Sequence, residues 1–207
     1  CELMVIKQKE SLWVGRTIAA QDIEAYVKRD MKKPVRDTTV GLLPPKLAQV
    51  LLNFGEWMVT QEALSKKDAV KKGVTTVLDP FCGTGVIPIE CLLRGDNVLA
   101  SDLSLKAVNG CTKNLEWTRK EYEIPKKDVT SKVEKHDAIK PFEFTAKEMP
   151  SVVVTEGTLG RPLTDRPNQK EMATLKSEAE KLTIAFLKNV RESLPGVPVV
   201  MTWPVWY

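Results

Sequence analysis

The chain has 207 residues, of which 43% are hydrophobic and 28% are charged, and its net charge is +4 at pH 7. These values are typical of a soluble protein with one sizeable globular domain and a small appendage, and two full domains are not expected. The longest apolar runs fall well short of the roughly 20 residues that cross a bilayer, so no membrane partner is expected.

The N-terminal part predicts a β-hairpin followed by a basic linker. Strands are expected at residues 3–6 and 12–19, joined by a polar turn at residues 8–11. Basic side chains then gather in one short segment: Lys28, Arg29, Lys32, Lys33 and Arg36. We expect them to bind nucleic-acid phosphates, although a solvated surface is an equally good interpretation. Residues 1–42 are assigned to this hairpin and linker, as the tail of a longer upstream region.

Residues 43–207 predict the main domain, in which strands and helices alternate. A helix is expected to begin near Pro45, because proline suits the first helical turn. Beyond a polar connection at residues 65–72, apolar runs alternate with segments of helical period. Strands are expected at residues 75–79, 97–101, 132–135, 151–155 and 197–203, and helices at residues 86–93, 105–122 and 169–193. This order predicts an α/β fold with a mostly parallel, doubly wound sheet, preceded by an N-terminal β-hairpin/helical extension.

A glycine loop follows the first strand of this domain: Asp79, Pro80, Phe81, Cys82, Gly83, Thr84 and Gly85. Glycine lets a ligand approach the backbone closely, and the start of the next helix offers free N–H groups, so the loop predicts a cofactor site. The third glycine of the dinucleotide spacing is missing and no Lys-Ser/Thr pair follows, which disfavours NAD and a P-loop. A glycine-rich turn without a ligand is the alternative interpretation.

Asp102 ends the second strand of the domain. A carboxylate at this position can accept hydrogen bonds from both hydroxyl groups of a ribose. Alternatively, Asp102 caps the following helix, which Ser104 could do equally well. We favour the ribose role because the glycine loop and the acid support each other.

These motifs resemble the Rossmann-fold RNA methyltransferases that often carry an RNA-binding THUMP domain and modify the exocyclic amine of guanosine in tRNA. The resemblance covers about residues 29–155 and rests on residues 79–90, on residues 101–104 with Ala107, Asn114 and Leu115, and on residues 41–48. It implies a class I methyltransferase domain with S-adenosylmethionine as cofactor and RNA, in particular tRNA, as partner. An upstream RNA-binding domain and a small activating subunit, which some eukaryotic relatives require, are further implied partners.

The resemblance also implies which residues hold the cofactor. The glycine loop would hold the methionine part, Asp102 and Leu103 the ribose and adenine, and residues 136–138 the adenine amine. The complete implied set is Pro45, Asp79, Pro80, Phe81, Cys82, Gly83, Thr84, Gly85, Asp102, Leu103, Asp137, Ala138 and Thr155. A seven-stranded methyltransferase sheet would still need a closing hairpin after residues 197–203. Either those strands are absent from this chain or the N-terminal hairpin covers that edge.

The chain departs from the family at the end of the fourth strand. The family carries Asp/Asn-Pro-Pro-Tyr there, whereas this chain reads Glu156-Gly157-Thr158-Leu159. Glu156 is the expected catalytic residue, as acceptor for the target amine, with a surface carboxylate in a loop as the alternative interpretation. Leu159 replaces the aromatic ring that stacks on the base. The leading hypothesis is methylation of guanosine N2 in tRNA. The alternatives are a DNA amine methylase, an inactive cofactor-binding RNA-binding or assembly subunit, and a small-molecule methyltransferase.

The cysteines and the single histidine predict no metal site. Cys1, Cys82, Cys91 and Cys111 form no Cys-x-x-Cys pair, so neither zinc nor a disulfide framework is expected. Reduced thiols in the cytoplasm are the simplest account, and Cys82 is interpreted as a packing residue. His136 is interpreted as a peripheral histidine, because methyl transfer by in-line displacement requires positioning more than a strong base. The sequence starts without an initiator methionine, which favours a start inside a longer polypeptide.

Overall fold

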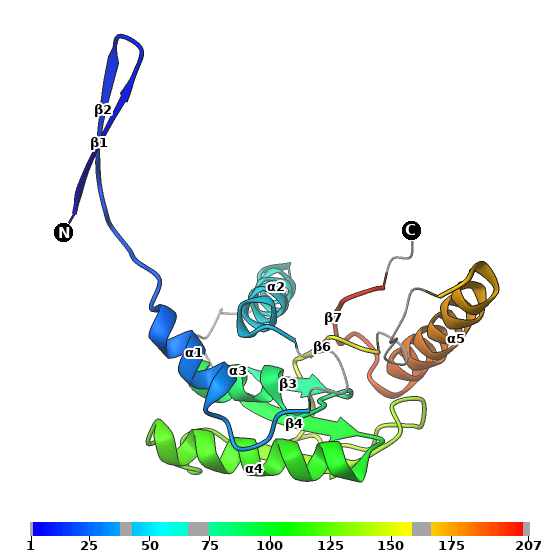
Figure 1. The fold of residues 1–207 in the computed structure, drawn as a ribbon. Coiled ribbons are helices and arrows are strands. Elements are labelled where there is room, and N and C mark those ends of the chain that lie inside the picture. The colour runs from blue at the N-terminus through cyan, green and yellow to red at the C-terminus, as the bar shows by residue number, and fades with distance from the viewer. Residues whose placement is uncertain (1, 38–42, 66–74, 159–166, 205–207) are drawn as a thin grey trace. The chain divides into compact units, whose positions relative to one another are not determined.

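The computed structural model describes residues 2–37, 43–65, 75–158 and 167–204 (Figure 1). The chain divides into two compact units, Cys1–Lys32 and Lys33–Tyr207. This boundary lies earlier than the one expected after residue 42, because the segment after Lys33 is bound to the larger unit. The N–H of Val35 donates to Oδ1 of Asn114 at 2.9 Å, and Nδ2 of Asn114 donates back to the carbonyl of Val35 at 2.9 Å.

The first unit contains the expected hairpin and a helix that covers part of the expected basic linker. Strands β1 (Leu3–Gln8) and β2 (Ser11–Arg16) pair antiparallel, and helix α1 (Ile23–Met31) follows. Asp22 caps this helix by accepting a hydrogen bond from the N–H of Ala25 at 2.9 Å. Glu24 in its first turn and basic residues in its last turn suit the helix dipole, so a stretch expected to be linker is helical.

The second unit is built on a five-stranded, fully parallel sheet. Its strands are β3 (Thr76–Asp79), β4 (Asn97–Asp102), β5 (Ser131–Lys135), β6 (Val152–Thr155) and β7 (Val199–Met201), in the order β5-β4-β3-β6-β7. The chain first runs outward from β3 to β5 and then crosses to the other side of β3. In such doubly wound sheets the ligand binds at the carboxyl ends of the strands where the direction changes, here β3 and β6. The predicted Rossmann-like α/β fold is thereby confirmed.

Four helices cover the sheet: α2 (Pro45–Ser65), α3 (Val86–Arg94), α4 (Leu105–Glu121) and α5 (Gln169–Ser193). Side chains alternate across the strands, which gives the sheet two apolar faces. Val77 and Val152 pack in one core with residues of α2, α3 and α4. Leu78 and Val153 point into the other core, where Phe186 of α5 is fully buried. The expected elements of this unit are present, with ends that differ by no more than two residues.

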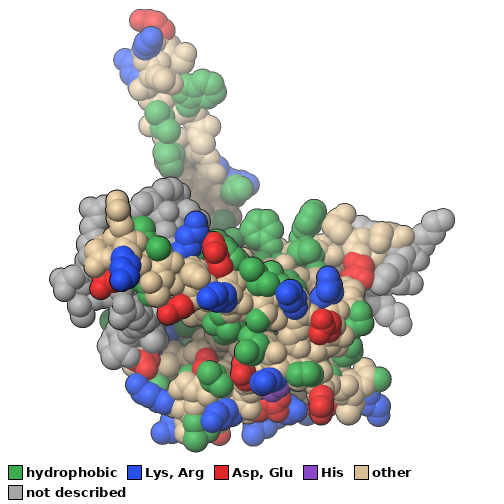
Figure 2. All heavy atoms as spheres, turned by 90° about the vertical axis from the view of Figure 1, so that its right-hand side faces the viewer, with side chains coloured by type: hydrophobic (Ala, Val, Ile, Leu, Met, Phe, Trp, Pro, Cys, Tyr) green, Lys and Arg blue, Asp and Glu red, His purple; other side chains and the backbone are tan. Residues whose placement is uncertain are grey.

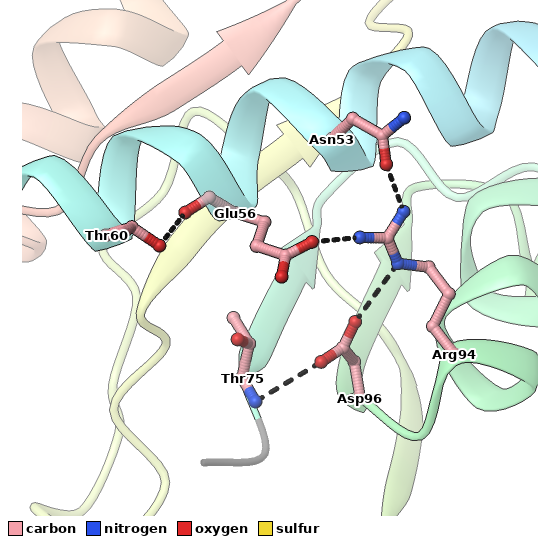
Figure 3. A network of polar contacts seen from close by, with 6 residues as sticks. All are labelled: Asn53, Glu56, Thr60, Thr75, Arg94 and Asp96. Carbon is pink, nitrogen blue, oxygen red and sulfur yellow. Dashed lines mark hydrogen bonds and ion pairs between the residues drawn. The ribbon is translucent and has the colours of Figure 1, made fainter. Parts of the chain in front are cut away.

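A polar network fixes α2 and α3 to each other and to the sheet (Figure 3). Arg94, at the end of α3, donates to Asn53 and Glu56 of α2 at 2.6 Å each. Its Nε lies 3.5 Å from Asp96, which accepts from the N–H of Thr75 directly before β3. The helix that follows the glycine loop is therefore held at its far end.

Among the helices within the described residues, none is both long and apolar enough to span a membrane.

Candidate functional site

The glycine loop connects the end of β3 to the start of α3 and lies beside the end of β4. The N–H of Cys82 donates to the carbonyl of Ser101 at 2.9 Å, and the N–H of Gly85 donates to the carbonyl of Cys82 at 2.8 Å. Gly83 and Gly85 have φ values of 50° and 91°, in the left-handed region that favours glycine. The loop therefore reverses direction within a few residues and presents its backbone at the carboxyl edge of the sheet.

Helix α4 packs so closely on this loop that only glycine fits at position 85. A Cβ atom on Gly85 would lie 2.7 Å from Sγ and 3.3 Å from Cα of Cys111. Nδ2 of Asn114, which is fully buried, donates to the carbonyl of Thr84 at 2.7 Å. A hydrogen bond to Cys111, together with burial, raises the pKa of the Cys82 thiol, so Cys82 is a neutral packing group.

Asp102 binds the loop from the neighbouring strand. Its Oδ2 accepts from the N–H of Gly83 at 3.0 Å, and its Oδ1 accepts from the N–H of Ser104 at 2.8 Å. Ser104 is the N-cap of α4, since its Oγ accepts from the N–H of Ala107 at 3.4 Å. The capping role weighed for Asp102 is thus filled by Ser104. The Asp102 carboxylate is only half-buried, and each oxygen keeps a lone pair for a ligand hydroxyl.

Asp79, the last residue of β3, is buried beneath the loop. Its Oδ1 accepts from Oγ1 of Thr155 at 2.7 Å and from the N–H of Phe81 at 3.3 Å. Burial, with a smaller effect from the charges of Asp102 and Glu156, raises the pKa of Asp79 to about 7, against the lowering effect of these two hydrogen bonds. Three carboxyl groups from three different strand ends thus converge on one edge of the sheet.

The raised pKa of Asp79 predicts how stability depends on pH. The folded state favours the protonated carboxyl. The contribution of Asp79 to the free energy of unfolding is therefore complete below about pH 4 and is lost as the pH rises through about 7. In Asp79→Asn the neutral amide can still accept both hydrogen bonds. Relative to this variant, the wild-type unfolding free energy should fall by up to about 4 kcal/mol over that range. Urea denaturation at a series of pH values measures the difference. Unfolding free energies that change with pH in parallel for the two proteins would contradict the prediction.

Glu156 follows β6 and lies next to this cluster. It is half-buried, and burial raises the pKa of its carboxyl. Its carbonyl accepts from Oγ1 of Thr202 at 2.6 Å, so the segment after β7 supports its backbone. Gly157 has a φ of 75°, and its N–H donates to Oγ1 of Thr155 at 3.2 Å. Leu159, expected to replace the stacking aromatic, lies outside the described residues.

The residues expected to hold adenine lie beside Asp102. The N–H of His136 donates to the carbonyl of Asp102 at 3.1 Å. Oδ1 of Asp137 accepts from the N–H of Ile139 at 3.2 Å, and Ala138 is buried with its carbonyl bound by Asn189. Leu103 is 65% exposed at the same edge, so its apolar side chain is accessible to a flat ring. His136 itself contacts Phe142 and the carbonyl of Lys140, as a peripheral histidine would.

The remaining expected residues are distributed more widely. Lys28 and Arg29 lie in α1 and Lys32 directly after it, in the smaller unit, whereas Arg36 belongs to the larger one. Lys33 is only 4% exposed, so it presents little surface to a phosphate. Pro45 is buried at the start of α2, and its part in cofactor binding stays a prediction, as do the other assigned roles.

Asn114 is part of the family resemblance, but its structural role in supporting the glycine loop was not predicted from the sequence. Asn114 bonds both to Val35 and to the carbonyl of Thr84 in the glycine loop. A signal was available, because Asn114 occupies the inward face of α4 together with apolar residues, where an amide must find partners. The positions of its partners, however, could not be read from the sequence.

Parts of this chain are similar in sequence to known proteins. The family model described as Conserved hypothetical protein 95 matches residues 58–146. A tRNA (guanine(10)-N2)-dimethyltransferase of Methanothermobacter thermautotrophicus is 29% identical over 154 residues, which cover 74% of this chain and 36% of that protein. The enzyme of the same name from Methanocaldococcus jannaschii is 32% identical over 159 residues, covering 75% of this chain and 39% of that protein.

Among solved structures, a precorrin 8w decarboxylase of Methanobacterium thermoautotrophicum has a TM-score of 0.49 and 16% sequence identity. The match covers 84% of this chain and 71% of that one. The curated relatives are much longer than their matched parts, so this chain spans well under half of their length.

Proposed function

From the relationship of this chain to S-adenosylmethionine-dependent tRNA guanine-N2 methyltransferases, we propose that its larger unit is the catalytic domain of such an enzyme. Its substrate is an exocyclic base amine, guanosine N2 in tRNA. The observation that carries the proposal is the meeting of the glycine loop, Asp102 and Glu156 at the carboxyl edge of β3, β4 and β6. This is the edge at which a doubly wound sheet binds its ligand.

The donor and acceptor groups at this edge fit S-adenosylmethionine. Gly83 and Gly85 add no side chains to the loop, so that its N–H groups and the start of α3 can meet the methionine carboxylate. Asp102 is pre-positioned by two backbone N–H groups to accept from the ribose hydroxyls. Exposed Leu103 and the turn at residues 137–138 lie where the adenine would rest.

The protein's task in the reaction is to hold the amine in line with the methyl group. When bound, the cofactor supplies a methyl group on a positively charged sulfur. Glu156 accepts a hydrogen bond from the target amine and directs its lone pair, and positioning of this kind supplies most of the acceleration in a displacement. A half-buried carboxylate with a raised pKa is also suited to take up the proton released when the new N–C bond has formed.

Replacing Glu156 with glutamine tests the assignment. We expect methyl transfer to fall by about 100-fold, because the amide is a weaker acceptor and cannot take up a proton. The affinity for S-adenosylmethionine should change by less than about threefold. Glu192→Gln, at an exposed position on α5, is the matched control. The measurement is incorporation of tritiated methyl into bulk tRNA by the full-length protein, and wild-type incorporation by the Glu156 variant would exclude this role.

A second candidate function is an inactive subunit that binds cofactor and RNA without turnover. It is favoured by Glu156-Gly157-Thr158, which stands where the family carries Asp/Asn-Pro-Pro-Tyr. Binding of both ligands without incorporation into tRNA or DNA would support it. Incorporation into DNA alone would identify a DNA amine methylase instead, and a small-molecule acceptor would leave both nucleic acids unlabelled.

The proposal includes the partners that such an enzyme needs. On the face shown in Figure 2, basic and acidic side chains are interspersed, so the described residues there form no single-sign patch for RNA. For tRNA binding we propose Lys28, Arg29, Lys32 and Arg36, together with an upstream RNA-binding domain, with or without an activating subunit. The free, buried thiols of Cys82, Cys91 and Cys111 support a reducing location such as the cytoplasm.

A further inference from the structure

One side chain connects the cofactor half of the site to the substrate half. Thr155 is the last residue of β6, and its side chain is completely buried. Its hydroxyl donates to Oδ1 of Asp79, which begins the glycine loop, at 2.7 Å. The same oxygen accepts from the N–H of Gly157 at 3.2 Å, in the segment that carries Glu156. Although Thr155 was placed among the cofactor-binding residues, its hydroxyl bonds to these two protein groups.

The two hydrogen bonds of this hydroxyl are linked through its single proton. When Asp79 is ionised, the proton points at the carboxylate, and the polarised oxygen is a strong acceptor for the N–H of Gly157. When Asp79 is protonated, the carboxyl can itself donate to Thr155, and the oxygen becomes a weaker acceptor for Gly157. The charge of a group under the cofactor loop therefore affects a backbone bond beside the target amine.

Further support for the segment comes from the end of β7 and from the residue that follows it. Thr202 donates to the carbonyl of Glu156 at 2.6 Å, and Cε of Met201 lies 3.3 Å from the position that a Cβ of Gly157 would occupy. Within the described part of the chain, the Thr155 hydroxyl links this segment to the glycine loop by hydrogen bonds to both. The groups that face Asp79 are the carboxyls of Asp102 and Glu156 and the donors Phe81 N–H and Thr155 O–H.

We propose that Thr155 is a positioning residue that couples Asp79 of the cofactor loop to the backbone around Glu156, so that cofactor binding sets the acceptor for the base amine. The proposal rests on the function proposed above. The methionine part of S-adenosylmethionine carries an α-ammonium group, and a cation held by the glycine loop favours the ionised form of Asp79. Ionised Asp79 then strengthens the Thr155 to Gly157 bond at the moment when the methyl donor is present.

An NMR titration tests the coupling without any need for catalysis. In the wild-type chain, the Gly157 amide resonance should shift with a midpoint near the pKa of about 7 at Asp79. The response should persist in Thr155→Ser, which keeps the hydroxyl, and disappear in Thr155→Val, which keeps the shape. A Gly157 resonance that titrates unchanged in Thr155→Val, or does not titrate in the wild type, overturns the proposal.

Kinetics separates positioning from simple cofactor binding. For Thr155→Val we expect kcat to fall about tenfold, the equivalent of one lost hydrogen bond, with cofactor Kd changed by less than about threefold. Thr155→Ser should recover most of the activity. An equal loss of cofactor affinity and kcat in Thr155→Val, or full activity in that variant, contradicts coupling.

Two outcomes outside the main comparison are also decisive. If Thr155→Val does not fold, Asp79→Asn in an otherwise wild-type chain takes its place, and a Gly157 titration that persists in this variant overturns the proposal. If the wild-type protein methylates no RNA, the proposed function fails. The Gly157 titration still decides the coupling in that case, because it needs only the folded chain.

Discussion

Replacing Gly85 with alanine is expected to lower the free energy of unfolding by about 2 to 5 kcal/mol and to abolish cofactor binding. The residue has a φ of 91°, which costs an L-amino acid energy wherever it occurs. In addition, the new methyl group would lie 2.7 Å from Sγ of Cys111 and 3.3 Å from its Cα. The backbone of α4 cannot yield as a flexible side chain could, so the loop or the helix must move.

Gly95→Ala is a matched control at the opposite end of α3. Its φ of 82° is similar, but a Cβ there would meet nothing within 4 Å. This variant should lose only the backbone contribution, about 1 to 2 kcal/mol, and should bind the cofactor normally. Urea denaturation and cofactor titration of both variants measure the difference. Equal destabilisation of the two would show that contact with Cys111 contributes nothing.

Replacing Asp102 with alanine is expected to weaken S-adenosylmethionine binding by about 100-fold or more. Hydrogen bonds to a charged acceptor contribute about 1.5 to 3 kcal/mol each, and two ribose hydroxyls would lose their acceptor. The N–H groups of Gly83 and Ser104 would lose theirs as well, so the loop would also be less ordered.

Asp128→Ala, in the exposed turn before β5, removes the same charge away from the site and should leave the affinity unchanged. Isothermal titration gives both dissociation constants, and thermal unfolding shows whether the Asp102 variant is folded. A folded Asp102→Ala protein with wild-type affinity for S-adenosylmethionine would show that Asp102 does not bind the ribose.

The sheet and the glycine loop could be predicted because their signals are local. Apolar runs such as residues 151–155 end in turn residues, and their alternation with helical segments implies a parallel, doubly wound sheet. The glycines of the loop stand directly between a strand and a helix. The bounds of helix α1 were not found from the sequence, although Ile23, Val27 and Met31 recur at helical spacing, because the basic residues of this stretch were interpreted as a linker. The cap at Asp22 marks the start of the helix.

The rest depends on contacts between residues far apart in the chain. Nothing near Asn114 in the sequence indicates that it binds Val35 and Thr84. Likewise, the bond from Thr155 to Asp79 exists only because β3 and β6 are neighbours in the sheet. The burial of Lys33 also follows from tertiary packing, which overrides the usual exposure of lysine.

The most direct test of the account is isothermal titration of this chain with S-adenosylmethionine and, in parallel, with NAD. We predict saturable binding of S-adenosylmethionine at a single site and no binding of NAD, because the loop lacks the third glycine of the dinucleotide spacing. Failure of the folded chain to bind S-adenosylmethionine, or equally tight binding of NAD, would contradict the assignment of the glycine loop and Asp102 to a methyltransferase cofactor.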